Sequence, residues 1–170
     1  LSVVKFMSDR MVVMNAGKVE EIEWQSADWQ LTDDTQLTLA TLESILASGK
    51  VDPGQIAGSI VNWYNAGRVV GIGASTLKAI QELRMGGHWA LVGRKGEYAA
   101  GNGAAMRIAP LAYFLNPEQE EDRWLIRDVC RITHHSEEAY CGALAVVLAI
   151  RYVLVNPTFS QGKFYEYLID

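Results

Sequence analysis

A series of helix-start signals divides this sequence, and apolar residues follow each signal at intervals of three or four positions. Asp52-Pro53 is typical, because an acidic N-cap residue precedes a proline at the first helical position. Apolar residues then recur at helical spacing, at Ile56, Ile60 and Trp63. This spacing places them on one face of a helix, so the segment is predicted to be an amphipathic helix that packs on a core.

The same pattern recurs along most of the chain. Further helix starts are predicted at a capping box of residues 33–36, at Ser75, at Asn116-Pro117, at Ser136 and at Ser160. Only the beginning differs, since residues 11–14 and 18–22 are typical of two short strands around a turn. No internal repeat or linker divides the sequence. We therefore predict one all-α domain over residues 1–170, with a short irregular or β-like N-terminal segment.

Net charge, hydropathy and cysteine content indicate which binding partners and which cellular compartment suit this protein. Fifteen Lys and Arg against twenty Asp and Glu leave a net charge of -5, which argues against a nucleic-acid groove or an anionic membrane surface. The most apolar segment, residues 139–150, ends before Arg151 and is predicted to be a buried helix, too short to cross a bilayer. Cys130 and Cys141 both lie in apolar helical patterns, so we predict reduced core thiols in a cytoplasmic protein.

Two adjacent carboxylates, Asp33 and Asp34, stand at a predicted helix start between Thr32 and Thr35. One aspartate at this place would be an ordinary N-cap residue. Two neighbouring carboxylates repel each other unless a positive group offsets them. A hard cation such as Mg²⁺ or Mn²⁺ would do so, because it takes carboxylate and hydroxyl oxygens as ligands. The spacing leaves both interpretations open.

A glycine-rich segment, Gly101-Asn102-Gly103, precedes another apolar stretch. Glycines let a ligand approach the main chain closely, and a helix that starts after Asn102 would offer free N–H groups to a phosphate. The alternative is a plain Asn-Gly turn that leads into a helix. Arg107 could pair with a phosphate or with an internal carboxylate, and the sequence does not decide between them.

Two other polar segments carry weaker signals. Gly71 and Gly73 lie in a stretch with too few glycines for the dinucleotide-binding motif, and no clear strand pattern precedes it. His134 and His135 are adjacent, so their side chains are expected to point in different directions and not to bind one metal together. His135 is predicted to be a solvated histidine at a helix start, whereas His134 stays open because it lies at a junction between two apolar helices.

Four segments also occur in a characteristic order: LTDDTQLTLA, GIGASTLKAI, AAGNGAAMRIAPLA and RITHHSEEAYCGALAVVLAI. In this order they resemble the ADP-ribosylglycohydrolases, the group that includes dinitrogenase-reductase-activating glycohydrolase. The resemblance runs from about Thr32 to Ile150. It implies an all-α orthogonal multi-helix bundle with a binuclear Mg²⁺ or Mn²⁺ centre in a cleft. It also implies hydrolysis of the bond at the anomeric carbon of ADP-ribose, in an ADP-ribosylated protein or a small ADP-ribose conjugate.

The same resemblance implies roles for individual residues. Thr32, Asp33 and Asp34 would supply half of the metal ligands, and Asp33 or Asp34 would also assist proton transfer from the attacking water. The ADP-ribose pocket would be lined by the residues of the glycine-rich segments and of the Thr-His pair, namely Gly71, Gly73, Gly101, Asn102, Gly103, Met106 and His134. Among these, the first two glycines would close over the distal ribose.

Two acidic motifs that flank these segments in the family are missing from this sequence. Before Thr32 there is no Gly-Asp-Ala-type motif and Asp9 stands alone, and after Ile150 only Asp170 is available in place of an Asp-x-Asp-Thr motif. We therefore expect a fragment of a larger ADP-ribosylglycohydrolase domain, and the sequence leaves open whether the fragment is active without the missing ligands. The alternatives are a module that binds ADP-ribose without hydrolysing it and a structural homologue that has lost catalysis.

Overall fold

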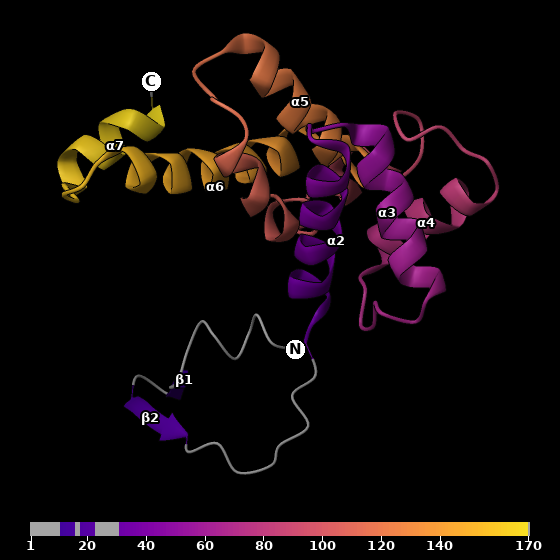
Figure 1. The fold of residues 1–170 in the computed structure, drawn as a ribbon, viewed down its shortest axis with the longest axis horizontal. Helices are drawn as coiled ribbons and strands as arrows, with labels where there is room; N and C mark the ends of the chain where they lie inside the picture. Colours follow the sequence, from indigo (N-terminus) through magenta and orange to yellow (C-terminus); the bar gives the residue numbers. More distant parts are fainter. Residues whose placement is uncertain (1–10, 16–17, 23–30, 170) are drawn as a thin grey trace. The chain divides into compact units, whose positions relative to one another are not determined.

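The computed structural model describes residues 11–15, 18–22 and 31–169 (Figure 1). The chain divides into two compact units, Leu1–Gln30 and Leu31–Asp170. Because each unit is described by itself, the prediction of one domain over residues 1–170 stays a prediction. Asp9 and Asp170, to which the sequence analysis pointed, lie outside the described residues.

The first unit contains a β-hairpin. Strand β1, Met11–Asn15, pairs antiparallel with strand β2, Lys18–Ile22, in a register that runs from Met11 opposite Ile22 to Asn15 opposite Lys18. The two short strands predicted at the beginning of the chain are therefore confirmed.

The second unit is helical, which confirms the all-α prediction. Its α-helices are α2 (Asp33–Ser48), α3 (Pro53–Asn65), α4 (Ala74–Arg84), α5 (Glu120–Arg131), α6 (Glu137–Val155) and α7 (Gln161–Ile169). Shorter elements connect them: β3 (Arg94–Lys95), β4 (His134–His135) and the 3₁₀-helices η1 (Glu97–Ala99), η2 (Ala105–Arg107) and η3 (Ala109–Tyr113). Figure 1 shows how these elements follow one another through the bundle.

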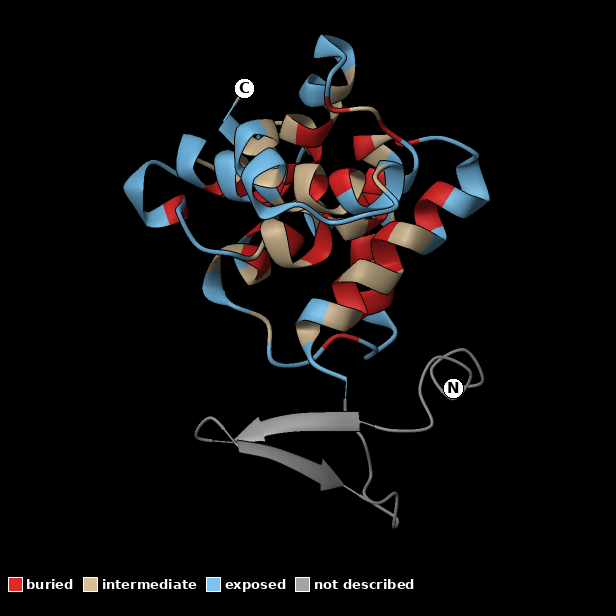
Figure 2. Ribbon diagram, turned by 90° about the vertical axis from the view of Figure 1, so that its left-hand side faces the viewer, coloured by how far each residue is buried: buried red, intermediate tan, exposed pale blue. Residues whose placement is uncertain are grey.

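The hydrophobic core lies between α2, α3, α5, α6 and η3. Fully buried apolar side chains come from each of these elements, among them Leu37, Ile56, Leu111, Val129 and Val147. In Figure 2 the buried positions lie on the sides of the helices that face one another. Each of these core helices thus buries one stripe, as the periodicity of the sequence predicted.

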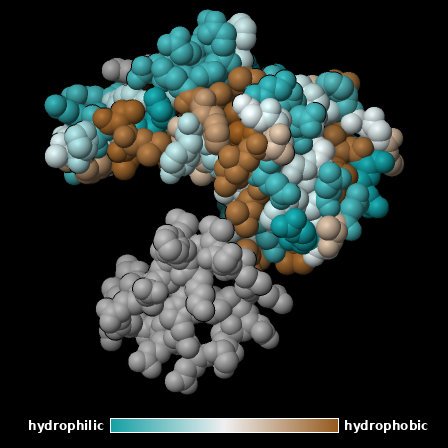
Figure 3. All heavy atoms as spheres, in the orientation of Figure 1, coloured by the Kyte–Doolittle hydropathy of each residue, from teal (hydrophilic) through white to brown (hydrophobic). Residues whose placement is uncertain are grey.

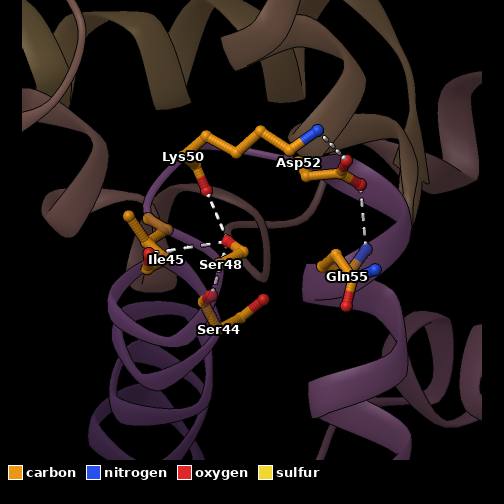
Figure 4. Close-up of polar contacts among 6 residues, drawn as sticks. All are labelled: Ser44, Ile45, Ser48, Lys50, Asp52 and Gln55. Atoms are coloured by element: carbon orange, nitrogen blue, oxygen red, sulfur yellow. Dashed lines mark hydrogen bonds and ion pairs between the residues drawn. The ribbon is translucent and has the colours of Figure 1, made fainter.

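The connection from α2 to α3 follows from local sequence signals (Figure 4). Helix α2 ends at Gly49, whose φ of 70° suits a residue without a Cβ. Asp52 then caps α3 as predicted, because its side chain accepts a hydrogen bond from Gln55 N at 3.1 Å. That bond, followed by the ion pair with Lys50 at 3.1 Å, lowers the pKa of the Asp52 carboxyl.

Other helix starts differ from the predicted positions by a few residues. Ser136 caps α6 as predicted, since it accepts a hydrogen bond from Ala139 N at 3.1 Å. Helix α4 begins at Ala74 with Gly73 at its N-cap, so Ser75 lies inside the first turn. Helix α5 begins at Glu120, later than the Asn116-Pro117 signal, because Asn116 instead accepts a hydrogen bond from Glu118 N in a turn before the helix.

Helix α6 is longer and less buried than predicted. It continues through Arg151 to Val155, and by length and composition alone it is long and apolar enough to cross a membrane. Only 22% of its apolar window is buried, and apolar surface is visible along this helix in Figure 3. The predicted segment is therefore part of a longer helix than expected, and it is only partly buried, with one face in the core at Ala139, Ala143 and Val147. Cys130 is a buried free thiol as predicted, but the free thiol of Cys141 on α6 is exposed and not part of the core.

Candidate active site

A cavity of about 270 Å³ lies where segments distant in the sequence meet. Most of the site residues inferred from the sequence line it, namely Asp33, Gly73, Gly101, Asn102, Gly103, Met106 and His134. It is also lined by Ala74, Ser75, Thr76 and Arg94, none of which was predicted to be a site residue. Thr32, Asp34 and Gly71 are not among the lining residues. The fold therefore gathers the glycine-rich segments, one of the paired aspartates and one histidine around a single cavity.

The paired aspartates lie in the first turn of α2 and do not cap it. Thr32 occupies the N-cap position without a side-chain cap hydrogen bond, and its hydroxyl donates to Asp34 Oδ2 at 3.1 Å. Asp33 is half-buried at the cavity wall, whereas Asp34 is exposed. Carboxylates in a first turn are favoured by the positive end of the helix dipole. The N-cap interpretation of the aspartates is thus wrong, and their role as metal ligands stays a prediction.

Gln36, predicted to complete a capping box, holds the start of α2 in a different way. Its buried side chain donates to Leu31 O at 2.5 Å and accepts a hydrogen bond from Val70 N at 2.9 Å. Thr38 Oγ1 lies 3.2 Å from Met106 O, which connects α2 to the segment after the glycine-rich loop. These contacts fix the start of α2, and with it Asp33, relative to the segment that precedes α4 and to the cavity wall at Met106.

The glycine-rich loop packs against the imidazole ring of His134. A Cβ atom added at Gly103 would lie 2.6 Å from His134 Cε1, and one added at Gly101 would lie 3.4 Å from His134 Nε2. Gly103 is therefore required by close approach. No α-helix starts after Asn102, because a turn and the short helix η2 follow instead. The helix required by the phosphate-site alternative is therefore missing from this segment, whereas the turn of the other alternative is present.

A helix N-terminus does face the cavity, but it belongs to α4. Gly73 caps this helix without a side-chain hydrogen bond, and the backbone hydrogen bonds begin with Leu77 N donating to Gly73 O at 3.0 Å. Among the described residues, the amides of Ala74, Ser75 and Thr76 therefore have no intrahelical acceptor. Together with the helix dipole they favour an anion at this end of α4. A glycine at a helix start without a capping side chain is the signal that could have indicated this.

Arg94 reaches the cavity through a short parallel pairing that no sequence pattern predicted. Arg94 lies opposite His134 and Lys95 opposite His135 in the pairing of β3 with β4. Gly93 precedes them with a φ of 88°, and a Cβ there would lie only 2.9 Å from Thr133 O. Glycine at this position thus allows the two segments to approach closely enough for Arg94 and His134 to share one wall.

His134 is buried and neutral, whereas its neighbour faces elsewhere. Only 3% of His134 is exposed, and burial, followed by the positive charges of Arg107, Arg94 and His135, lowers its pKa from the usual 6.5 to about 4. His135 is half-buried rather than solvated, and its Nε2 lies 2.6 Å from Val92 O. The two rings point apart as predicted, and only His134 lines the cavity.

Arg107 is fully buried beneath the cavity wall and does not line it. Its Nη2 donates to Val129 O at 2.8 Å and to Thr133 Oγ1 at 3.1 Å. Burial lowers the pKa of its guanidinium to about 10. Among the described residues Arg107 forms no ion pair with a carboxylate, and it does not line the cavity where a phosphate would bind. Instead it donates to a carbonyl near the carboxyl-terminal end of α5.

The stability of the fold is expected to decrease as the pH falls from about 6.5 to about 4. In that window the unfolded chain binds a proton at His134 that the folded chain excludes. The contribution of His134 to the free energy of unfolding is therefore complete above pH 6.5 and is lost as the pH falls towards 4. The slope from this group is about 1.4 kcal/mol of unfolding free energy per pH unit. Urea unfolding at a series of pH values measures it.

The matched comparison uses two histidine variants. His134→Gln should flatten the pH dependence in this window, while His88→Gln, which alters an exposed ring, should keep the wild-type slope. Equal slopes in wild type and His134→Gln would contradict a buried neutral imidazole at position 134.

The donors at the start of α2 suit part of a divalent-cation shell. Thr32, Asp33 and Asp34 offer only carboxylate and hydroxyl oxygens, which are the ligands that Mg²⁺ and Mn²⁺ prefer. The described ranges contain no group of three or more His, Cys, Asp or Glu side chains placed to hold a metal ion. These three residues therefore fit one side of a metal centre and do not complete it.

Comparisons with known proteins identify the family of this chain. A family model described as ADP-ribosylglycohydrolase matches residues 3–168. The ADP-ribosylarginine hydrolase Tri1 of Pseudomonas putida is 32% identical over 135 residues, which cover 72% of this chain and 34% of the relative. A glycohydrolase of Rhodospirillum rubrum, named for ADP-ribosyl-dinitrogen reductase, is 33% identical over 107 residues. The alignment covers 62% of this chain and 35% of the Rhodospirillum rubrum protein.

The fold has a solved counterpart as well. A chain of an ADP-ribosylglycohydrolase-related protein complex aligns with a TM-score of 0.58 and 29% identity, over 75% of this chain and 41% of the other. This sequence spans between about a quarter and two fifths of the length of the curated relatives that it matches. The family model nevertheless covers almost every residue, so the chain belongs to the ADP-ribosylglycohydrolase family.

Proposed function

We propose that the protein hydrolyses the bond at the anomeric carbon of ADP-ribose in an ADP-ribosylated substrate. The observation that carries this proposal is the single cavity lined by Asp33, Arg94, His134, the start of α4 and the glycine-rich loop. At about 270 Å³ it lies near the lower end of small-molecule sites. That volume suits the diphosphate and the reacting ribose, with the adenosine extending outward.

The diphosphate would lie at the start of α4. The first-turn amides of Ala74, Ser75 and Thr76 and the dipole of an 11-residue helix favour an anion there. Arg94 on the same cavity wall adds a guanidinium, which binds phosphate oxygens with two N–H groups. His134, neutral at pH 7, would contribute a hydrogen bond without adding charge.

The reacting ribose would lie towards Asp33. Thr32, Asp33 and Asp34 would hold one side of a Mg²⁺ or Mn²⁺ centre, and a bound divalent cation would orient the ribose hydroxyls and acidify a water molecule. Asp33, the carboxylate at the cavity wall, would accept a proton from the attacking water. Its negative charge would also stabilise an oxocarbenium-like transition state.

The substrate class follows from the names of the relatives. The Pseudomonas putida protein is named for ADP-ribosylarginine and the Rhodospirillum rubrum protein for ADP-ribosyl-dinitrogen reductase. We therefore propose an ADP-ribosylated protein as substrate, with arginine as the first linkage to assay, and a cytoplasmic location consistent with two free thiols.

Calorimetry with ADP-ribose tests the proposal, and two neighbouring cations provide a matched pair. Arg94→Met should weaken ADP-ribose binding about 10- to 100-fold, because a charge-assisted hydrogen bond to phosphate is lost. Lys95→Met removes the same charge from the next residue of β3, which is exposed and does not line the cavity, and should change the affinity little. Equal effects of the two variants would contradict a diphosphate site at Arg94.

A hydrolysis assay on the same protein separates catalysis from binding. Release of ADP-ribose from ADP-ribosylated arginine, dependent on Mg²⁺ or Mn²⁺, is expected. Tight binding of ADP-ribose without metal and without any hydrolysis would favour the non-catalytic binding module instead.

A further inference from the structure

A chain of hydrogen bonds runs from the buried interior to the cavity wall. Arg107 Nη2 lies 3.1 Å from Thr133 Oγ1, and that oxygen lies 2.8 Å from His134 Nδ1. Arg107 and Thr133 are fully buried and do not line the cavity. The side chains of these two residues are therefore linked by hydrogen bonds to the cavity at the ring of His134.

The direction of these hydrogen bonds follows from the available donors. A guanidinium only donates, so Thr133 Oγ1 accepts from Arg107. The hydroxyl hydrogen of Thr133 then needs an acceptor, and within the described residues its hydrogen-bonding neighbour that can accept is His134 Nδ1. If Nδ1 carried a hydrogen, the buried hydroxyl would lose its acceptor, which is an unfavourable arrangement.

An accepting Nδ1 determines the state of the other ring nitrogen. A neutral imidazole carries one hydrogen, so that hydrogen lies on Nε2. Nε2 faces the glycine-rich loop, since added Cβ atoms at Gly101 and Gly103 would lie 3.4 and 3.2 Å from it. In the described part of the chain Nε2 has no hydrogen-bond partner, so its hydrogen is available on the cavity side.

We propose that Arg107 and Thr133 are positioning residues that hold His134 in its Nε2–H tautomer, so that it presents a neutral hydrogen-bond donor to an anionic oxygen of the ligand. The identity of that oxygen, a diphosphate oxygen of ADP-ribose, rests on the proposed function, whereas the tautomer does not. Burial and the charges of Arg107, Arg94 and His135 keep the ring neutral. The ring therefore donates one hydrogen bond and carries no charge.

Arg107 is well suited to orient the hydroxyl of Thr133. Its Nε and Nη1 atoms are buried without an acceptor among the described residues, so the guanidinium depends on Val129 O and Thr133 Oγ1. Because the Thr133 oxygen is occupied by this donor, its hydrogen turns towards the ring of His134. The buried guanidinium thereby determines which atom donates and which accepts in each of these hydrogen bonds.

Nitrogen-15 NMR of the histidine rings in the complete chain tests the tautomer directly. Wild-type His134 should show a protonated Nε2 and an unprotonated Nδ1 between pH 6 and 8. Thr133→Val, which keeps the shape of the side chain and removes the hydroxyl, should abolish this single-tautomer signature. Thr133→Ser, which restores the hydroxyl, should recover it, a rescue that a purely structural role would not require.

Calorimetry with ADP-ribose gives a second readout. Thr133→Val should weaken binding about tenfold, the equivalent of one hydrogen bond, and Thr133→Ser should bind like wild type. A protonated Nδ1 in wild-type His134 would overturn the proposal even if Thr133→Val fails to fold, and so would a changed tautomer without any change in affinity. A wild-type protein that binds no ADP-ribose would refute the proposed function, while the spectra would still decide the tautomer.

Discussion

Replacing Asp33 with asparagine is expected to lower the rate of ADP-ribose release at least about 100-fold with little change in stability. Replacing a residue that only hydrogen-bonds to a metal ligand typically lowers metal affinity or activity about 10- to 100-fold. Asp33 is proposed to have a more direct role, because it would both bind the metal and accept a proton. The amide has nearly the same shape but lacks the charge and the basic oxygen. The rate is measured with ADP-ribosylated arginine at saturating Mg²⁺ or Mn²⁺.

A carboxylate in the first turn of another helix provides the control. Glu121→Gln removes a negative charge from the first turn of α5, as Asp33→Asn does from α2, but Glu121 is exposed and does not line the cavity. It should lose the same helix-dipole stabilisation, a few tenths of a kcal/mol to about 1 kcal/mol, and retain full activity. Wild-type activity in Asp33→Asn would remove this residue from the proposed mechanism.

Gly103→Ala is expected to destabilise the fold by about 1–3 kcal/mol and to weaken ADP-ribose binding at least about tenfold. The new methyl carbon would lie 2.6 Å from His134 Cε1 and 3.3 Å from Thr76 Oγ1. The imidazole is buried and hydrogen-bonded to Thr133, so it cannot move aside freely. Thermal unfolding measures the first effect and calorimetry the second.

The neighbouring glycine gives a matched comparison for this prediction. In Gly101→Ala the added carbon would lie 3.4 Å from His134 Nε2, an ordinary van der Waals distance, and no other residue would be closer. The same chemical change in the same loop should therefore cost much less stability. Equal losses in the two variants would show that flexibility of the loop, and not contact with His134, requires the glycines.

The parts of the fold that were predictable depend on neighbouring residues in the sequence. The cap at Asp52 and the cap at Ser136 each involve a backbone amide three residues away, so their signals are local and their positions are confirmed. The start of α2 was placed correctly for a wrong reason. Gln36 there bonds to Val70, a residue 34 positions away that no capping rule considers.

The unpredicted parts of the site depend on contacts between distant segments. Arg94 lies in the cavity wall because β3 pairs with β4, and each of these strands has only two residues. Strands of this length produce no alternating pattern in the sequence. The exposed face of α6 was not predictable either, because a uniformly apolar sequence does not indicate which of its faces meets the core. Cys141 was therefore assigned to the interior although it is exposed.

The pairing of β3 with β4 has a consequence for how such a site can diversify. Arg94 and His134 are placed side by side by main-chain pairing and by the glycine at position 93, and no hydrogen bond found among the described residues joins their two side chains. Selection can therefore exchange the side chain at position 94 and alter the charge that the cavity accepts, while the position of His134 stays the same. The β3–β4 pairing preserves the position of His134, and the side chain at position 94 can vary without disturbing that pairing.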